Sequence, residues 1–204
     1  MIVLSENDVM VDVETLGTVP GCALLSIGAC RVLTSSDFFY AVCSDPLECG
    51  LRANDSDTLR WWLGKNETAR QEIRTNFSLP TQDVLTKFWK WLLCNFPSRN
   101  AEEVFTENAQ VAENKPFRIW AYGADFDLPI LRFAFHYLLP NLKFEKELWG
   151  YRKGRCLRTL FDERGRPSLE RPETRHNALV DVQYQSQLLR LTCDPKIETE
   201  VENG

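Results

Sequence analysis

The amino-acid sequence predicts an α/β protein in which helices flank a mixed β-sheet. Three strand-like segments open the chain, at residues 8–14, 23–33 and 37–42, and helix-like and strand-like segments alternate after them. The chain has 204 residues, of which 44% are hydrophobic and 11% aromatic, so it can bury a sizeable core. Since no internal repeat or linker-like stretch divides it, we expect a single domain over residues 1–193.

The first segment, residues 8–14, has the pattern of a buried strand. Successive side chains of a strand point to opposite faces, so three valines share one face while Met10, Asp12 and Glu14 share the other. Turn-forming residues follow this segment. We therefore expect the next two strands to pair with it as an antiparallel meander.

Four later segments have the apolar spacing of amphipathic helices, and they are residues 56–63, 81–93, 128–139 and 177–191. Ser56 or Asp57 is expected to cap the first helix and Asn177 the last, because these side chains accept hydrogen bonds from first-turn N–H groups. Pro129 is expected in the first turn of the third helix, where proline is tolerated. A short strand is predicted at residues 118–122.

Charge and cysteine content exclude several classes of protein. The net charge of −5 is not that of a protein that holds nucleic acid by bulk positive charge. The seven cysteines form no Cys-x-x-Cys pair, which argues against a disulfide framework or a zinc ribbon. The longest apolar stretch, residues 19–33, is interrupted and too short to span a bilayer, and residues 194–204 have the composition of a disordered tail. We expect a cytoplasmic protein without membrane contact.

Two carboxylates, Asp12 and Glu14, lie side by side on one face of the first strand, with Cα atoms about 7 Å apart. Inside an otherwise apolar strand they would repel each other unless a cation compensates, and a divalent metal does so for oxygen ligands. The alternative is an ordinary solvated strand end. The Asp-x-Glu pattern by itself does not distinguish the two.

A further acidic position follows the strand predicted at residues 118–122. Asp127 lies where this strand meets the next helix, two residues after Asp125. Either aspartate could instead be a helix cap, and position alone does not separate a cap from a ligand.

A histidine and an aspartate lie at the start of the last predicted helix. His176 precedes the Asn177 cap and Asp181 lies about one turn into the helix, so both can face one site. The other histidine, His136, lies among aromatic residues of the third helix, where a packing or surface role is expected. An imidazole with an ordinary pKa of ~6.5 can accept a proton near neutral pH, which favours His176 as a general base.

Together these elements resemble the three motifs of the DEDD exonucleases, histidine subclass. The matching residues, in the family's order and over nearly the whole chain, are Asp12-Val-Glu14-Thr-Leu, Phe126-Asp127 and His176-x-Ala-x-x-Asp181. Within that superfamily, one further segment resembles the branch that contains phage exonuclease A and the mycobacterial RNase AS proteins. This segment is Thr58-Leu-Arg-Trp61-Trp62-Leu63. Gly123 stands where many relatives have asparagine, a difference that bears only on a substrate or turn contact.

The resemblance implies a ribonuclease H-like fold and a metal-dependent 3′–5′ exonuclease that releases nucleoside 5′-monophosphates. It implies that Asp12, Glu14 and Asp181 hold one Mg²⁺ or Mn²⁺, while Asp12 also bridges to a second ion. Asp127 would act on that second ion, largely through water, and His176 would be the general base. Two such ions stabilise the attacking and leaving oxygens of phosphodiester hydrolysis.

Substrate contacts are expected around this centre. By the same resemblance, Thr15, Leu16 and Phe126 would contact the substrate. Adjacent helical residues cannot both face one surface, so one of Trp61 and Trp62 is expected to stack on a terminal base and the other to pack in the core. Trp61 is the candidate for the substrate contact.

Residues 151–175 form a basic segment within an acidic chain, directly before the histidine motif. Such a segment suits a phosphate backbone, and Arg158 is the candidate contact. The alternative is a solvated loop.

The expected partner is single-stranded nucleic acid with a free 3′ end. DNA is slightly favoured through the phage-like branch, exoribonuclease activity is the alternative, and the sequence leaves a homodimer open. A binding module that has lost its chemistry is less expected, because the ionisable motif residues are intact. A ribonuclease H-type endonuclease is less expected because of the His-x-Ala-x-x-Asp spacing.

Overall fold

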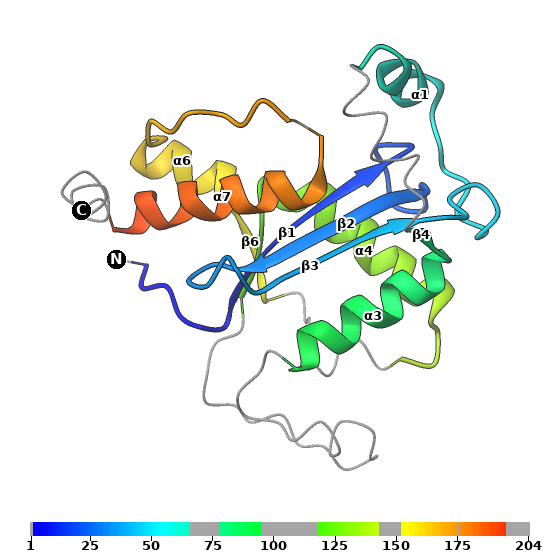
Figure 1. The fold of residues 1–204 in the computed structure, drawn as a ribbon, viewed down its shortest axis with the longest axis horizontal. Helices are drawn as coiled ribbons and strands as arrows, with labels where there is room; N and C mark the ends of the chain where they lie inside the picture. The colour runs from blue at the N-terminus through cyan, green and yellow to red at the C-terminus, as the bar shows by residue number, and fades with distance from the viewer. Residues whose placement is uncertain (1, 66–77, 95–117, 143–151, 175, 195–204) are drawn as a thin grey trace.

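The computed structural model describes residues 2–65, 78–94, 118–142, 152–174 and 176–194. Within them, a six-stranded sheet has the order β4-β3-β2-β1-β5-β6 (Figure 1). Its strands are β1 (Asp8–Thr15), β2 (Leu24–Arg31), β3 (Phe38–Cys43), β4 (Ser78–Leu79), β5 (Arg118–Ala121) and β6 (Gly154–Cys156). β1, β2 and β3 form the predicted antiparallel meander, whereas β5 is parallel to β1 and β6, and β4 is parallel to β3.

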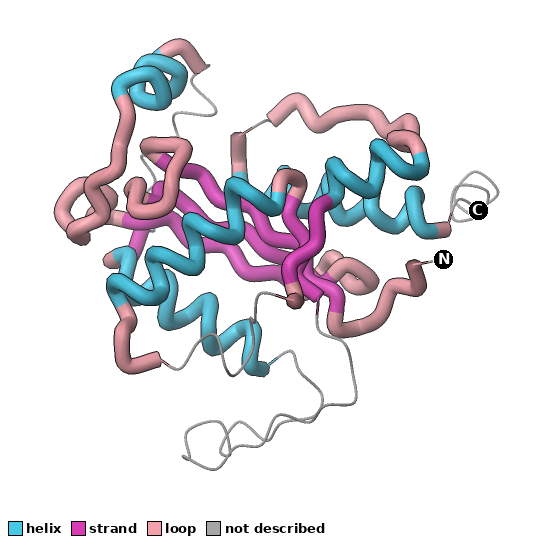
Figure 2. The backbone as a smooth tube through the Cα atoms, turned by 180° about the vertical axis from the view of Figure 1, so that it is seen from behind, coloured by secondary structure: helices cyan, strands magenta, loops and turns pink. Residues whose placement is uncertain are grey.

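Helices cover both faces of this sheet. The helices of the described residues are α1 (Ser56–Leu63), α3 (Thr81–Cys94), α4 (Ala124–Leu138), α6 (Leu157–Arg164) and α7 (Ala178–Cys193). α6 and α7 lie on one face, and α3 and α4 lie on the other (Figures 1 and 2). The predicted α/β fold, a ribonuclease H-like mixed sheet flanked by helices, is therefore confirmed.

The alternation along β1 separates two parts of the core. The valines of β1 pack with apolar side chains of α3 and α4. On the other face, Met10 packs with apolar side chains of α6 and α7. Asp12 and Glu14 follow Met10 on this second face, so the strand directs both carboxylates toward α7.

The first turn of α7 lies against the backbone of β2 at Gly28. A Cβ atom added to Gly28 would lie 2.2 Å from the carbonyl oxygen of Ala178. As predicted, Asn177 caps α7, and its side chain accepts a hydrogen bond from the N–H of Val180 at 2.9 Å. Because Gly28 pairs with Asp12 of β1, this turn of α7 begins beside the acidic face of β1.

The cap of α1 differs from the prediction. Asp55 is the cap, and its carboxylate accepts hydrogen bonds from the backbone N–H of Thr58 at 2.6 Å and from the Thr58 hydroxyl at 2.8 Å. Ser56 and Asp57 already lie inside the helix, whereas Asp55 has the extended backbone of a capping residue.

The start of α4 also differs from the prediction. The helix begins at Ala124 rather than at residue 128, because the extended Gly123 is its cap. The carbonyl oxygen of Gly123 accepts a hydrogen bond from the backbone N–H of Asp127 at 3.4 Å. Pro129 consequently lies beyond the first turn, where it has no N–H to donate to the carbonyl of Asp125.

Some elements are absent from the prediction. β4 and β6 are too short to give a periodic pattern, and the many charges of α6 obscure its apolar side. Of the predicted tail, residues 195–204 lie outside the described part of the chain. Among the described helices, none has the length and hydropathy needed to cross a membrane.

Gly28→Ala is expected to lower the free energy of unfolding by about 1–3 kcal/mol, because the added methyl group must displace α7 or β2. Gly64→Ala is the matched control, since the nearest atom to its added Cβ is 3.5 Å away and its backbone is helical. Urea denaturation of both variants measures the effect. Equal midpoints would show that the contact between α7 and β2 is not needed for stability.

Candidate active site

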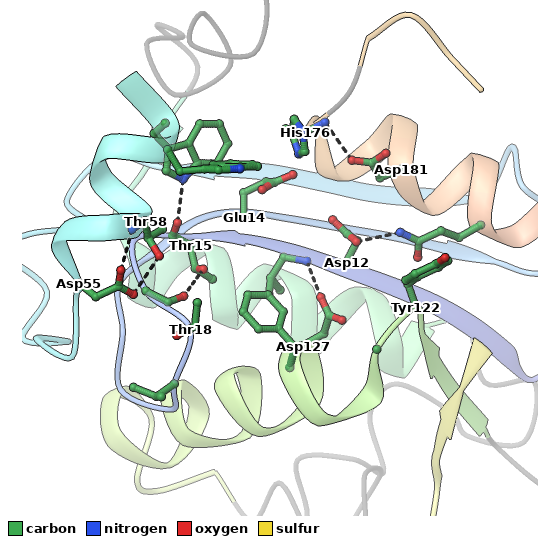
Figure 3. Close-up of a pocket in the computed structure, with 18 of the residues that line it drawn as sticks. Asp12, Glu14, Thr15, Thr18, Asp55, Thr58, Tyr122, Asp127, His176 and Asp181 are labelled. Carbon is green, nitrogen blue, oxygen red and sulfur yellow. Dashed lines mark hydrogen bonds between the residues drawn. The ribbon is translucent and has the colours of Figure 1, made fainter. Parts of the chain in front are cut away.

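Acidic side chains from three elements meet in one cavity of about 880 Å³. Asp12 and Glu14 come from β1, Asp127 from α4 and Asp181 from α7 (Figure 3). Among the predicted site residues, Leu16 is the one outside the cavity wall. The others all line it, and they are Asp12, Glu14, Thr15, Trp61, Phe126, Asp127, Arg158, His176 and Asp181.

Asp12 lies at the centre of this acidic cluster. Burial raises the pKa of Asp12 well above its ordinary value, and the charges of Asp127, Glu14 and Asp181 raise it further. A hydrogen bond from the side-chain amide of Gln185 to Oδ1 of Asp12, at 2.9 Å, lowers the pKa. The groups that act most strongly on Asp12 therefore disfavour its ionisation.

Asp127 is only 4% exposed, and its Oδ1 accepts a hydrogen bond from the N–H of Val13 at 3.2 Å. This bond joins the first turn of α4 to β1. Burial raises the pKa of Asp127 to about 7, while the Val13 N–H and the positive charge of Arg158 lower it. Asp125, in contrast, is exposed and lines a separate cavity together with His136. Asp127 is therefore the aspartate of this pair that faces the acidic cluster.

His176 has a left-handed backbone, with φ of 64°, which is uncommon for a residue other than glycine. Its backbone N–H donates to Oδ2 of Asp181 at 3.0 Å, a bond that favours this conformation. A ring nitrogen of His176 and carboxylate oxygens of Glu14 and Asp181 lie within 4.8 Å of one another. The ring also packs edge-on against Trp61, with 4.5 Å between centroids. This imidazole is placed either to accept a proton or to act as a ligand.

The two tryptophans of α1 differ in exposure, as predicted, but contrary to the prediction both line the cavity, and their rings meet edge-on with 5.1 Å between centroids. Trp62 is 4% exposed and donates from Nε1 to the carbonyl oxygen of Thr15 at 2.9 Å, which holds α1 on the end of β1. Trp61 is 42% exposed and lies beside His176. Leu16 packs with Trp62 in a small buried cluster, which is why its side chain does not line the cavity.

The chemistry of these residues fits a divalent cation. Mg²⁺ and Mn²⁺ prefer carboxylate oxygens, and the cluster supplies carboxylates from three separate elements. Burial raises the pKa of Asp12 most, and repulsion among these acids raises it further; a bound cation would relieve that repulsion. The residues present therefore suit the metal site that the sequence resemblance implies.

Further side chains of the cavity wall are absent from the prediction, notably Gln185, Tyr122 and Tyr184. The spacing of four residues between Asp181 and Gln185 could have identified Gln185, because residues four apart share a helix face. Tyr122 directly follows β5, whereas Tyr184 lies on α7, and only the tertiary fold brings the two side chains to the same cavity.

Comparison with known proteins assigns this arrangement to the 3′–5′ exonucleases. The chain belongs to the family described as the 3′–5′ exoribonuclease Rv2179c-like domain, whose model matches residues 7–192. A curated relative, the 3′–5′ DNA exonuclease Cap18 of Escherichia coli, is 26% identical over 193 residues, covering 90% of this chain and 89% of that protein. Among solved structures, cell-death related nuclease 4 (CRN-4) gives a TM-score of 0.49 at 13% identity over 96% of this chain. The chain spans 66% of the CRN-4 chain, slightly less than two thirds.

In excess chelator, the free energy of unfolding should fall as pH rises between about 4 and 7. An unfolded aspartate has a pKa of about 3.9, whereas burial raises that of Asp127 to about 7. The fold therefore binds this proton more tightly, and its contribution, on the order of 2–4 kcal/mol, is present at low pH and lost above the folded pKa.

Asp127→Asn should remove part of this pH dependence, and Asp125→Asn is the matched control because Asp125 is exposed. Urea denaturation at a series of pH values measures both. A pH dependence that is unchanged in Asp127→Asn would contradict the raised pKa.

Proposed function

We propose that this 3′–5′ exonuclease hydrolyses single-stranded nucleic acid, with DNA favoured, in the presence of two Mg²⁺ or Mn²⁺ ions. The products would be nucleoside 5′-monophosphates. The observation that carries the proposal is the cluster of Asp12, Glu14, Asp127 and Asp181 beside His176 in one cavity. The histidine supports membership of the histidine subclass of the DEDD exonucleases, and Trp61 supports the branch of phage exonuclease A and the RNase AS proteins.

The carboxylates would hold the ions. Asp12, Glu14 and Asp181 would bind one ion, and Asp12 together with Asp127 the other. When bound, the ions would stabilise the attacking and leaving oxygens of the hydrolysis. Gln185 would keep the Asp12 carboxylate in place through its bond to Oδ1, which leaves the second oxygen of Asp12 for other partners.

The remaining lining residues would orient the substrate and transfer the proton. His176 would accept the proton of the attacking water, since its ring nitrogen lies beside the oxygens of Glu14 and Asp181. Trp61 offers an exposed indole on which a terminal base can stack. Thr15, Phe126 and Arg158 would contact the terminal nucleotide or its phosphate, whereas the buried Leu16 would act by shaping the wall.

The sugar of the substrate is the point on which the similar proteins differ. The curated relative with 89% of its length matched is named a DNA exonuclease, which supports DNA, while the family description names an exoribonuclease, which supports RNA. RNA is therefore the second candidate. Free 3′ ends of single strands are the proposed partner.

Strands labelled at either end test the proposal. With Mg²⁺ or Mn²⁺, 5′-labelled DNA should shorten in single-nucleotide steps, and 3′-labelled DNA should release labelled mononucleotide at once. Matched RNA strands decide between the two sugars. Excess chelator should stop the reaction, because the acidic cluster then lacks its cations. Undiminished cleavage by metal-free protein would refute the metal dependence, and internal cuts would refute the exonuclease.

His176→Ala should lower the rate of single-turnover hydrolysis by roughly 10²–10⁴-fold at neutral pH, because the proton acceptor is lost. The carboxylates remain, so calorimetric titration with Mn²⁺ should give nearly unchanged affinity. His136→Ala is the matched control, since His136 is exposed on α4 and lines the separate cavity. A large loss of Mn²⁺ affinity in His176→Ala would show that the histidine is a ligand rather than a base.

A further inference from the structure

Two guanidinium groups pack against the ring of Tyr122 at one side of the cavity. The Cζ atom of Arg158 lies 5.2 Å from the ring centroid, and that of Arg166 lies 5.9 Å from it. Tyr122 and Arg158 both line the cavity wall. The two positive charges on one ring repel each other. An anionic ligand bound next to both would offset this repulsion and stabilise the arrangement.

Hydrogen bonds hold this arrangement in place. Arg166 donates from Nη1 to the Tyr122 hydroxyl at 3.3 Å and from Nη2 to the Tyr184 hydroxyl at 3.4 Å. The Tyr184 hydroxyl donates in turn to the carbonyl oxygen of Leu169 at 3.2 Å. Arg158 donates its backbone N–H to the carbonyl oxygen of Tyr122 at 3.0 Å. We call Tyr122, Arg158, Arg166 and Tyr184 the arginine–tyrosine wall.

The Arg158 side chain of this wall lies beside Gly123. A Cβ atom added to Gly123 would lie 3.4 Å from Nη2 of Arg158, so the guanidinium rests against the backbone just before α4. Among the described residues, no carboxylate forms an ion pair with Arg158 or Arg166. A guanidinium has five N–H donors, and Arg166 uses two of its nitrogens on neutral hydroxyls. Donors suited to a phosphate therefore remain at this wall.

The opposite end of the cavity has a different charge. Its lining includes Asp55 and Asp57 of the α1 region, together with Trp61. Figure 3 shows Asp55 and Tyr122 on opposite sides of Asp12. The 3′-terminal nucleoside carries no phosphate on its 3′ side, so it suits the aromatic and acidic end. The rest of the strand, which carries one phosphate at every linkage, suits the end with the arginines.

We propose that the arginine–tyrosine wall binds the backbone phosphate of the linkage on the 5′ side of the bond that is cut. The proposal rests on the proposed function, because the cleaved bond must lie at the carboxylates. It also assigns a direction to the substrate, whose 5′ portion leaves the cavity over α6. Arg166 then acts without touching the reacting atoms, as a residue that binds and orients the strand.

Oligonucleotides with one uncharged methylphosphonate linkage test this assignment. The protein with its natural sequence should lose about tenfold to a hundredfold in kcat/KM for the first cleavage when the second linkage from the 3′ end is neutral. A neutral linkage far from the 3′ end should have little effect. Arg166→Ala should lose a similar factor on the unmodified strand, and the neutral second linkage should then cause no further loss.

Arg164→Ala is the matched control, because Arg164 is an exposed arginine two residues before Arg166, at the end of α6. Within the described part of the chain, the hydrogen bonds to the hydroxyls of Tyr122 and Tyr184 come from Arg166 and not from Arg164. It should keep both the rate and the sensitivity to the neutral linkage. If Arg166→Ala shows an altered circular dichroism spectrum or unfolding midpoint, Arg166→Gln replaces it as the variant that is tested. Full sensitivity to the neutral second linkage in both Arg166 variants would overturn the proposal, as would no sensitivity in the unaltered protein. Failure of the proposed function is distinct, since the unaltered protein would then release no mononucleotide from any strand.

Discussion

The contact between the first turn of α7 and the backbone of β2 at Gly28 determines where the chemistry of this protein is assembled. Gly28 is the partner of Asp12 across the sheet, so a helix that rests on Gly28 begins beside that carboxylate. The same turn carries Asp181, and Gln185 follows it on the same helix face. A larger residue at position 28 would lift α7, and with it both side chains, away from β1.

Electrostatic repulsion within this site is the consequence of that packing. Asp12 and Asp127 are ionised at a cost, because burial raises the pKa of both, and the neighbouring carboxylates raise the pKa of Asp12 further. Hydrogen bonds from the Val13 N–H and from Gln185 reduce this cost without removing it. A buried acidic cluster of this kind is more useful for binding cations than for stabilising the fold. If the cluster holds divalent ions as proposed, the cost of ionising the metal-free site and the affinity for those ions would have one cause.

The flanks of the acidic cluster have opposite character. On one side, Trp62 fixes α1 to the end of β1 and leaves Trp61 accessible next to His176. On the other side, the arginine–tyrosine wall presents positive charge on aromatic rings. An exonuclease that begins at a 3′ end has to treat the two sides of the cleaved bond differently, and in the proposed orientation this asymmetry would supply different chemistry for each.

The sequence by itself determined the fold class, the meander and the elements that carry the acidic motifs, because alternation and helical spacing are local patterns. It also predicted that Trp61 would be the more accessible of the two tryptophans of α1, although both rings line the cavity. The Asp55 cap and the start of α4 were misjudged, because several polar residues compete for each cap and only backbone conformation selects one. The motif resemblance had already selected Asp127 over Asp125. Only the tertiary structure decided that Asp127 bonds to the N–H of Val13, that Leu16 packs beneath Trp62, and that Tyr122 meets Arg158 and Arg166. These relations join β1 to α4, the end of β1 to α1, and β5 to α6, and contacts between segments distant in the chain leave no periodic trace in the sequence.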